Sequence, residues 1–300
     1  MHTSTTGGLT MIKEMLASLP PSERKIANYI LKHPDTAVLC TTGELGERTN
    51  TSGAAVIRLC KSLGLKGFQD LKIRIAGDLQ KPKQEGYRDI HPHESQSEVL
   101  SKMTSNSVQA ITETEEMLNP DALARAVEAI LSARRIHFFG VGASSIIALD
   151  AQQKFLRINK EAVSFSDIHM AAMHVANLTE DDVVMGISFS GQTEEVVKLI
   201  DLANEKRATT ISLTKYGTTS VSERASIRLF TSASKEAVFR SAATSSRLAQ
   251  LHVIDILYMC VASEEYEDSI KWLDQTRQAI HFLGSKSNKK QGGKDGHMDS

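Results

Sequence analysis

The sequence predicts two differently folded parts, an all-α head over residues 1–80 and a larger α/β body with a parallel sheet. In the head, apolar side chains recur at helical spacing in short segments such as "SERKIANYILKHP" and "GFQDLKIRIAGDL". From Arg134 onward, short apolar runs such as "RIHFFG" and "DDVVMGI" alternate with helical segments. That alternation is typical of parallel strands with helices on both faces of the sheet.

Changes in composition along the chain suggest where the domains end. Residues 81–104 contain the polar, non-periodic stretch "KPKQEGYRDIHPHESQS" and the start of a connecting helix, so we expect a linker there. Residues 105–283 hold the body with its flanking helices. Residues 284–300 are poor in apolar side chains, and we expect them to form a disordered tail.

Composition excludes several classes of protein. The chain is 41% apolar and 24% charged, as in soluble globular proteins, and no apolar run reaches the ~18 residues of a membrane span. No secretory signal is visible at the start. The three cysteines lie too far apart for a metal site, and their odd number argues against a disulfide framework. We therefore expect a cytoplasmic protein with free thiols and without a metal or other cofactor.

The segment "TTGELGERTNTSGAAVIRLCKSLGLKG" predicts two short helices joined by a tight turn. In the second helix, Val56, Leu59 and Cys60 share one face, and the opposite face is small, polar and basic. Such a face suits the major groove of DNA, and the head carries a net charge of +3 from 10 Lys and Arg against 7 Asp and Glu. The spacing alone also fits an ordinary helical hairpin. The candidate DNA-binding residues are Asn50, Thr51, Ser52, Ala54, Arg58 and Lys61.

The head resembles a known family. The stretch "LPPSERKIANYILKHP" and the later pattern S-x-x-x-V-I-R-L-C-K-x-L-G-x-x-G-F-x-D-L-K are similar to the N-terminal helix-turn-helix of RpiR-type bacterial transcription regulators. The resemblance implies that this head binds DNA. It also implies that the helix over residues 51–63 enters the major groove.

Two strand ends in the body carry glycines and hydroxyls, in "HFFGVGASSIIALD" and "VVMGISFSGQTEEVVKLI". Ligands bind at the carboxyl ends of parallel strands, where helix N–H groups and hydroxyls can hold a phosphate without Lys or Arg. One such loop could equally be a helix cap, whereas two in one sheet favour a binding site. A nicotinamide site is disfavoured, because the G-x-G-x-x-G motif requires glycine at Ser145.

These two loops resemble those of the SIS (sugar isomerase) domain, a three-layer α/β fold that binds phosphosugars. The similarity covers about residues 105–262. It implies that the phosphosugar is held by Ser144, Ser145, Ser188, Ser190, Gly191, Gln192 and Thr193. The later segment "SKEAVFRSAATSSRLAQLHVIDIL" is also similar to RpiR-type SIS domains, which implies that Glu236 and Arg240 lie near the ligand.

A helix-turn-helix joined to an SIS domain is the RpiR arrangement, which implies a repressor of sugar or amino-sugar metabolism genes. Within this family the chain resembles MurR-like regulators, which implies a response to N-acetylmuramic acid 6-phosphate. The expected partners are operator DNA, this phosphosugar and further copies in a dimer or tetramer, with no membrane. The alternative is a phosphosugar isomerase or lyase, with its base among Glu236, His169, His174 and His252. A DNA-binding head has no role in such an enzyme, so we expect no catalytic residue.

Overall fold

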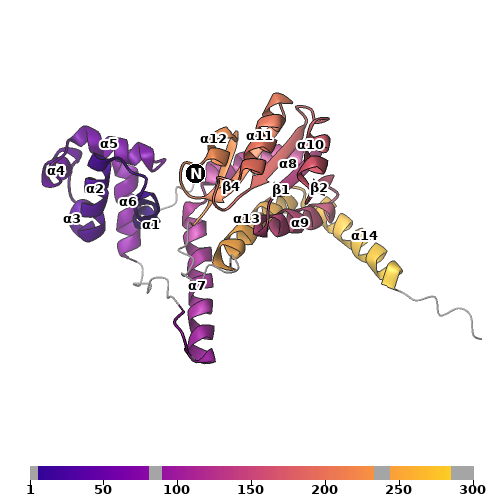
Figure 1. The fold of residues 1–300 in the computed structure, drawn as a ribbon, viewed down its shortest axis with the longest axis horizontal. Coiled ribbons are helices and arrows are strands. Elements are labelled where there is room, and N and C mark those ends of the chain that lie inside the picture. The colour runs from indigo at the N-terminus through magenta and orange to yellow at the C-terminus, as the bar shows by residue number, and fades with distance from the viewer. Residues whose placement is uncertain (1–5, 81–89, 233–243, 285–300) are drawn as a thin grey trace, which may run out of the picture.

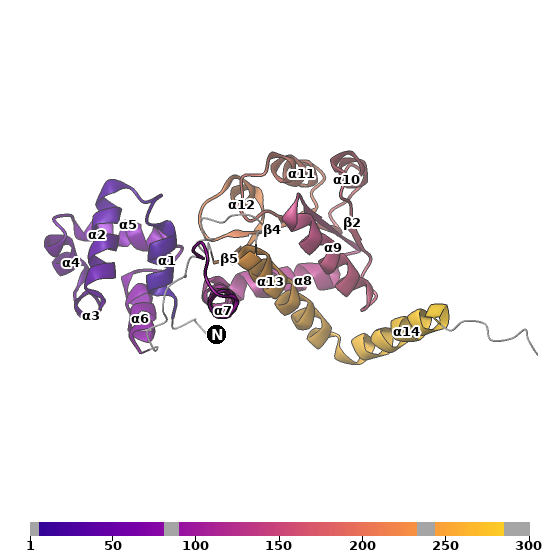
Figure 2. The same cartoon turned by 60° about the horizontal axis from the view of Figure 1, so that its bottom comes forward.

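The computed structural model describes residues 6–80, 90–232 and 244–284, with the head at one end and the body beside it (Figure 1). Helix α7 (Gln96–Met117) stands between head and body, and α14 (Tyr266–Gly284) projects from the far side of the body (Figures 1 and 2). The expected linker overlaps residues 81–89 and the expected tail overlaps residues 285–300. Both of these stretches lie outside the described residues.

Short amphipathic helices build the head. They are α1 (Gly8–Met15), α2 (Pro21–Lys32), α3 (Pro34–Ala37), α4 (Thr42–Arg48), α5 (Gly53–Ser62) and α6 (Phe68–Leu79). Their apolar faces share one core, in which Ile26, Leu59 and Leu71 are fully buried. Local signals fix the helix starts, since Thr41 and Glu44 form a reciprocal capping box before α4. The all-α head is confirmed.

The body is built on a five-stranded sheet with the order β2-β1-β3-β4-β5. All neighbouring strands are parallel. The strands are β1 (Arg135–Gly140), β2 (Ala162–Ser164), β3 (Asp182–Ile187), β4 (Thr209–Lys215) and β5 (Ile227–Thr231). The chain runs from β1 to β2 on one side and then to β3 on the other, so the winding reverses between β1 and β3. Parallel strands with helical connections confirm the predicted α/β body.

Helices cover both faces of the sheet, which gives three layers (Figure 2). In β1, Phe138 packs with the helices of one face and Phe139 with those of the other, because successive strand side chains alternate. The first face carries α8 (Pro120–Ser132), α9 (Ala143–Leu156) and α13 (Thr244–Glu264). The second carries α10 (Ile168–Val175), α11 (Glu194–Glu205) and α12 (Ser220–Arg224).

Two further sequence expectations concern the thiols and the membrane. Cys40 and Cys60 are buried, Cys260 is half-buried, and all three are free. Within the described ranges, no helix is long and apolar enough to cross a membrane.

A buried carboxylate anchors the start of β3. Asp182 is fully buried and accepts hydrogen bonds from the Arg134 guanidinium at 2.6 and 3.1 Å. It also accepts from the Thr179 backbone N–H at 2.8 Å. Burial alone raises the pKa of Asp182, but the hydrogen bonds from Arg134 and Thr179 outweigh it and hold the pKa below its ordinary value.

Asp182→Asn is expected to lower the free energy of unfolding by about 1–3 kcal/mol at pH 7. Because the folded-state pKa is lowered, the carboxylate stabilises the fold above pH ~3.9 and loses this effect as pH falls through the folded pKa. The difference between wild type and variant should therefore shrink below about pH 4, as urea unfolding can measure. The exposed neighbour Asp181 supplies the control Asp181→Asn. Equal destabilisation by both substitutions would contradict the prediction.

Candidate functional site

The first candidate site is the helix-turn-helix formed by α4 and α5. The helices meet closely at Gly46, where an added Cβ would lie 2.8 Å from the backbone of Ser52 and Gly53. Asn50 makes the turn with a left-handed φ of 53°, which asparagine tolerates better than most residues. Ser52 caps α5 by accepting from the Ala55 N–H at 3.2 Å. Backbone and cap thus fix the direction in which α5 leaves the turn.

Helix α5 presents the expected polar face to solvent. Val56, Leu59 and Cys60 are buried, whereas Ala54, Arg58, Lys61, Asn50 and Ser52 are exposed and Thr51 is half-exposed. The sequence analysis missed Ile57, which is 38% exposed and lies on the same face. Helical spacing could have placed Ile57 on this face, because it stands three residues after Ala54 and four before Lys61. An apolar side chain among basic ones can contact a thymine methyl group.

The second candidate site lies where β1 and β3 end side by side. Gly140 of β1 is the register partner of Ile187 of β3, so the loops that follow them are neighbours. The sheet reverses its winding between these two strands, which is where open parallel sheets bind ligands. The structure therefore brings together the two hydroxyl-bearing loops, residues 141–145 and 188–193. We refer to these two loops as the cradle.

The β3 loop of the cradle holds a compact group of hydroxyls. Ser188 Oγ is 2.8 Å from Thr193 Oγ1 and 3.4 Å from Ser190 Oγ. The backbone N–H groups of Gly191 and Gln192 donate to Ser188 Oγ and Ser190 Oγ at 3.1 and 3.2 Å. Gly191 has a left-handed φ of 66°, which glycine adopts without strain. These contacts fold the loop tightly around its own hydroxyls.

Helix capping does not explain these hydroxyls. Thr193 stands at the N-cap position of α11, yet its side chain makes no cap hydrogen bond and contacts Ser188 instead. Gly142 stands at the N-cap position of α9 and has no side chain to offer. Both helices at the cradle therefore start without a side-chain cap, as α1, α2 and α6 also do, whereas α4, α5 and α7 are capped. A helix start whose N–H groups are not closed by a side chain favours an anion.

The β1 loop of the cradle places its two serines differently. Ser145 is half-exposed and donates to the Gly142 carbonyl at 2.7 Å. Ser144 is only 7% exposed and lies 3.4 Å from the side chain of Gln250 on α13. Sequence analysis did not find Gln250, since it follows Ser144 by 106 residues and no local pattern marks it. Gln250 therefore supports the floor of the cradle from a distant helix.

The charge around the cradle is modest. Within the described ranges, the recorded partners of its hydroxyls are other hydroxyls, backbone groups and Gln250, with no lysine or arginine. Glu194 and Glu195 both stand in the first turn of α11. Glu194 is paired with Lys198 at 2.6 Å, which reduces its repulsion of an anion. Glu236 and Arg240 were expected near the ligand from the resemblance to RpiR-type SIS domains, and both lie outside the described residues.

The comparisons with known proteins agree with this architecture. A model of the helix-turn-helix domain of the rpiR family matches residues 6–82, and a model of the SIS domain matches residues 129–260. The uncharacterized HTH-type transcriptional regulator YbbH of Bacillus subtilis is 54% identical over 93% of this chain and 98% of its own length. A similar regulator of Caldanaerobacter subterraneus is 43% identical over 92% of this chain and 97% of its own.

A solved structure is similar over nearly the whole chain. The Vibrio vulnificus NanR protein complexed with ManNAc-6P superposes with a TM-score of 0.58 and 26% identity. The match covers 92% of this chain and 99% of that one. Both family models and full-length relatives therefore agree on the head and the body. The chain belongs to the RpiR family of helix-turn-helix transcriptional regulators, whose body is an SIS domain.

Proposed function

We propose that this regulator binds operator DNA through residues 1–80 and a phosphosugar effector through residues 105–283, joined by a linker over residues 81–104. The observation that carries the proposal is the cradle, two helix starts without side-chain caps and five nearby hydroxyl side chains in the same chain as a helix-turn-helix. The complex of NanR with ManNAc-6P supports an amino-sugar phosphate as effector. N-acetylmuramic acid 6-phosphate is the second candidate.

A thermal-shift screen tests the effector class. ManNAc-6P, N-acetylmuramic acid 6-phosphate and N-acetylglucosamine 6-phosphate are each compared with the corresponding sugar without phosphate. A ligand at 100 times its Kd stabilises the native state by about 2.7 kcal/mol, so the true effector raises Tm clearly. Equal shifts by phosphorylated and unphosphorylated sugars, or none at all, would refute a phosphate cradle. With repression as the proposed mode of action, the same effector lowers operator affinity in a gel-shift assay.

We infer that the body binds its phosphosugar without converting it. An isomerase needs a base whose pKa is close to the working pH. Of the four expected bases, Glu236 lies outside the described residues and His252 is half-buried on α13. His169 is exposed on α10, and His174 packs against His137 with ring centroids 5.1 Å apart. Burial lowers the pKa of both His137, to about 3, and His174, so both are weak bases. Incubation with ManNAc-6P should return it unchanged by NMR, and turnover would reverse this assignment.

Arg58→Ala is expected to weaken operator binding about tenfold or more, because a basic side chain in the groove contributes about 1–3 kcal/mol. The effector should bind the variant as it binds wild type, since Arg58 lies on α5 in the head. Lys25→Ala is the matched control, because Lys25 is an exposed cation on α2 of the same head. Fluorescence anisotropy measures both. If Arg58→Ala and Lys25→Ala bind the operator equally well, α5 is not the recognition helix.

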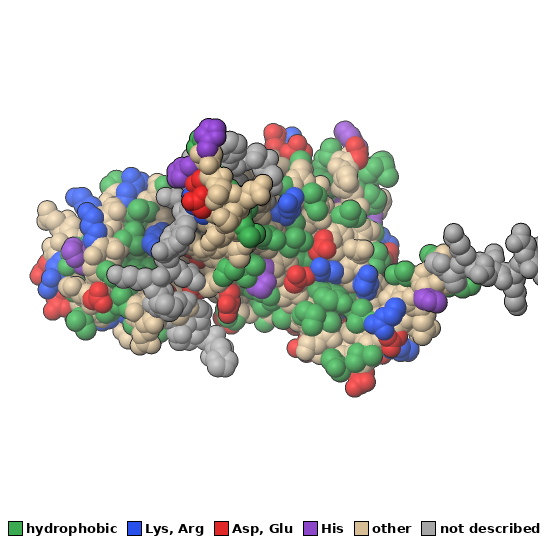
Figure 3. All heavy atoms as spheres, turned by 90° about the horizontal axis from the view of Figure 1, so that it is seen from below, with side chains coloured by type: hydrophobic (Ala, Val, Ile, Leu, Met, Phe, Trp, Pro, Cys, Tyr) green, Lys and Arg blue, Asp and Glu red, His purple; other side chains and the backbone are tan. Residues whose placement is uncertain are grey.

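We also propose that the body self-associates through α9 and α13. Helix α9 buries one side against the sheet but exposes Ile146, Leu149 and Leu156 on the other, and α13 exposes Met259. Apolar side chains gather on the lower face of the body (Figure 3). Large exposed apolar patches are rare in monomers, and paired heads would match a two-fold operator. Sedimentation equilibrium distinguishes monomer, dimer and tetramer.

A further inference from the structure

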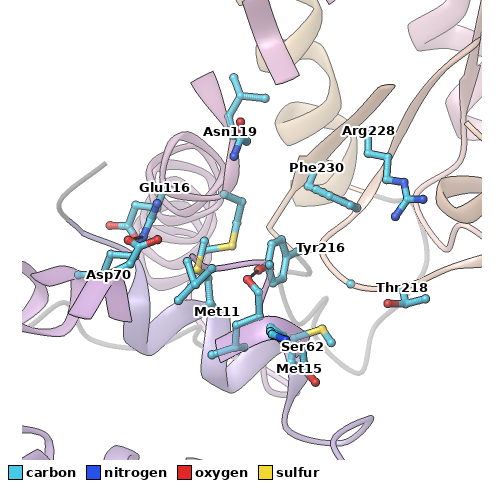
Figure 4. A pocket seen from close by; sticks show the side chains of 18 of the residues that line it. Met11, Met15, Ser62, Asp70, Glu116, Asn119, Tyr216, Thr218, Arg228 and Phe230 are labelled. Atoms are coloured by element: carbon cyan, nitrogen blue, oxygen red, sulfur yellow. Dashed lines mark hydrogen bonds and ion pairs between the residues drawn. The ribbon is translucent and has the colours of Figure 1, made fainter. Parts of the chain in front are cut away.

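The loop after β4 connects the body to the recognition helix. The Tyr216 hydroxyl donates to the carbonyl of Leu63, at the end of α5, over 2.6 Å. The Tyr216 ring packs edge-on against Phe230 of β5, with centroids 5.4 Å apart, and both rings contact the core of the head. Beside them, a Cβ added to Gly217 would lie 3.2 Å from Met15 Sδ of α1. Figure 4 shows Tyr216 and Phe230 of the body facing Met15 of the head.

The same loop and the start of α12 hold the cradle from its other side. The Val221 N–H donates to the Gly191 carbonyl at 3.0 Å, and the Ser220 hydroxyl donates to Gln192 Oε1 at 2.6 Å. Thr219 lies so close to Gly191 that an added Cβ there would meet Thr219 Oγ1 at 2.3 Å. A shift of the β3 loop of the cradle therefore displaces residues 219–221 directly.

A pocket opens at the contact between head and body. A cavity of about 350 Å³ lies between them, lined from the head by Met11 and Met15 and from the body by Tyr216, Arg228 and Phe230 (Figure 4). Tyr216 and Leu63 both line this pocket, so the hydrogen bond between them spans the junction of head and body.

We propose that residues 216–222 form a mechanical link between the cradle and the recognition helix, with Tyr216 as the positioning residue at the head end. Movement of Gly191 and Gln192 shifts Thr219 and Ser220. This shift moves Tyr216 and so changes its hydrogen bond to the Leu63 carbonyl. The inference rests on the proposed function only in naming a phosphosugar as the natural trigger. The link itself is a property of the chain without ligand.

The hydroxyl of Tyr216 keeps its donor role at all physiological pH values. Burial raises the pKa of this phenol above its usual value, so the group stays protonated. The carbonyl of Leu63 lies at the C-terminal end of α5, where helix carbonyls lack partners inside the helix. Tyr216 therefore supplies from the body a hydrogen bond to the end of α5.

Hydrogen–deuterium exchange of the full chain, without ligand, tests the link. The reporters are the amides of Gly64 and Leu65, which donate to Lys61 and Cys60 carbonyls at 2.9 Å in the last turn of α5. Tyr216→Phe keeps the ring but removes one hydrogen bond, so exchange at residues 60–66 should quicken by roughly two- to tenfold. Gly191→Ala should quicken exchange at the same residues, because the new Cβ displaces Thr219.

Gly142→Ala is the matched control. Gly142 is in the other cradle loop with a similar left-handed φ of 60°, but an added Cβ there meets nothing within 4 Å. It should leave exchange at residues 60–66 unchanged. If Gly191→Ala does not fold by circular dichroism, Ser220→Ala takes its place, since it removes only the bond to Gln192.

Two outcomes overturn the link. In the first, amide exchange at residues 60–66 is as slow in the Gly191 or Ser220 variant as in wild type. In the second, Gly142→Ala quickens exchange at these residues as much as Gly191→Ala does, which would show that either substitution destabilises the whole chain. Neither outcome depends on an effector, so failure of every sugar phosphate in the thermal-shift screen refutes the proposed function and leaves this result standing.

Discussion

Gly46→Ala is expected to abolish operator binding at concentrations that saturate the wild type. The added Cβ would lie 2.8 Å from the backbone N of Gly53 and the carbonyl C of Ser52. Neither atom belongs to a side chain that could turn away, so α4 and α5 must separate. Overpacking of this kind costs about 1–3 kcal/mol, and a displaced α5 no longer presents Arg58 correctly.

Gly43→Ala, on the same helix, separates this clash from a general effect of alanine. An added Cβ at Gly43 finds only Thr41 Oγ1, at 4.0 Å. Alanine favours a helix over glycine by about 1 kcal/mol, so this variant should be as stable as wild type or slightly more stable. Calorimetry gives the two Tm values, and fluorescence anisotropy gives the operator affinities. Wild-type affinity in Gly46→Ala would show that α4 and α5 can separate without cost.

The second large effect is expected from Ser190→Ala combined with Thr193→Ala. Both hydroxyls lie in the β3 loop of the cradle, and hydrogen bonds to a charged group contribute about 1.5–3 kcal/mol each. Effector affinity should therefore fall about a hundredfold or more, and the operator response should disappear, while operator binding itself is retained. Isothermal titration with the sugar phosphate selected by the thermal-shift screen measures the affinity.

A pair of hydroxyls away from the cradle supplies the control. Thr112 on α7 and Ser132 on α8 donate to carbonyls of their own helices at 3.0 and 2.9 Å. Thr112→Ala with Ser132→Ala removes the same chemical groups and should leave effector binding unchanged. If the cradle variant instead binds the effector normally, the phosphate is held elsewhere in the chain.

Local sequence patterns were sufficient to predict the fold class. The runs "RIHFFG" and "DDVVMGI" became β1 and β3, because short apolar runs between helices have little alternative to a buried parallel sheet. The turn at Asn50 and the buried face of α5 followed from helical spacing and turn residues. The two cradle loops could also be expected to lie close together, because both follow strands of one parallel sheet.

Contacts between distant segments could not be predicted in the same way. Gln250 meets Ser144 across 106 residues, and Tyr216 meets Leu63 across 153. Such pairs depend on strand order and on how α13 and the head pack. A short stretch of sequence holds no information about either. The exposure of Ile57 could have been predicted from the sequence. Helical spacing places it on the polar face, but its apolar side chain led us to leave it out of the DNA-binding residues.

The contrast between a cradle of hydroxyls and a basic recognition helix has a consequence for cells under osmotic stress. In the proposed complex, contacts of Arg58 and Lys61 with DNA weaken steeply as ionic strength rises, because the release of counterions that favours binding gains less free energy at high salt. Hydrogen bonds from hydroxyls and helix N–H groups act at contact distance, where dissolved ions screen them little. Operator occupancy would therefore follow the salt content of the cell, whereas effector sensing in the cradle would stay nearly constant.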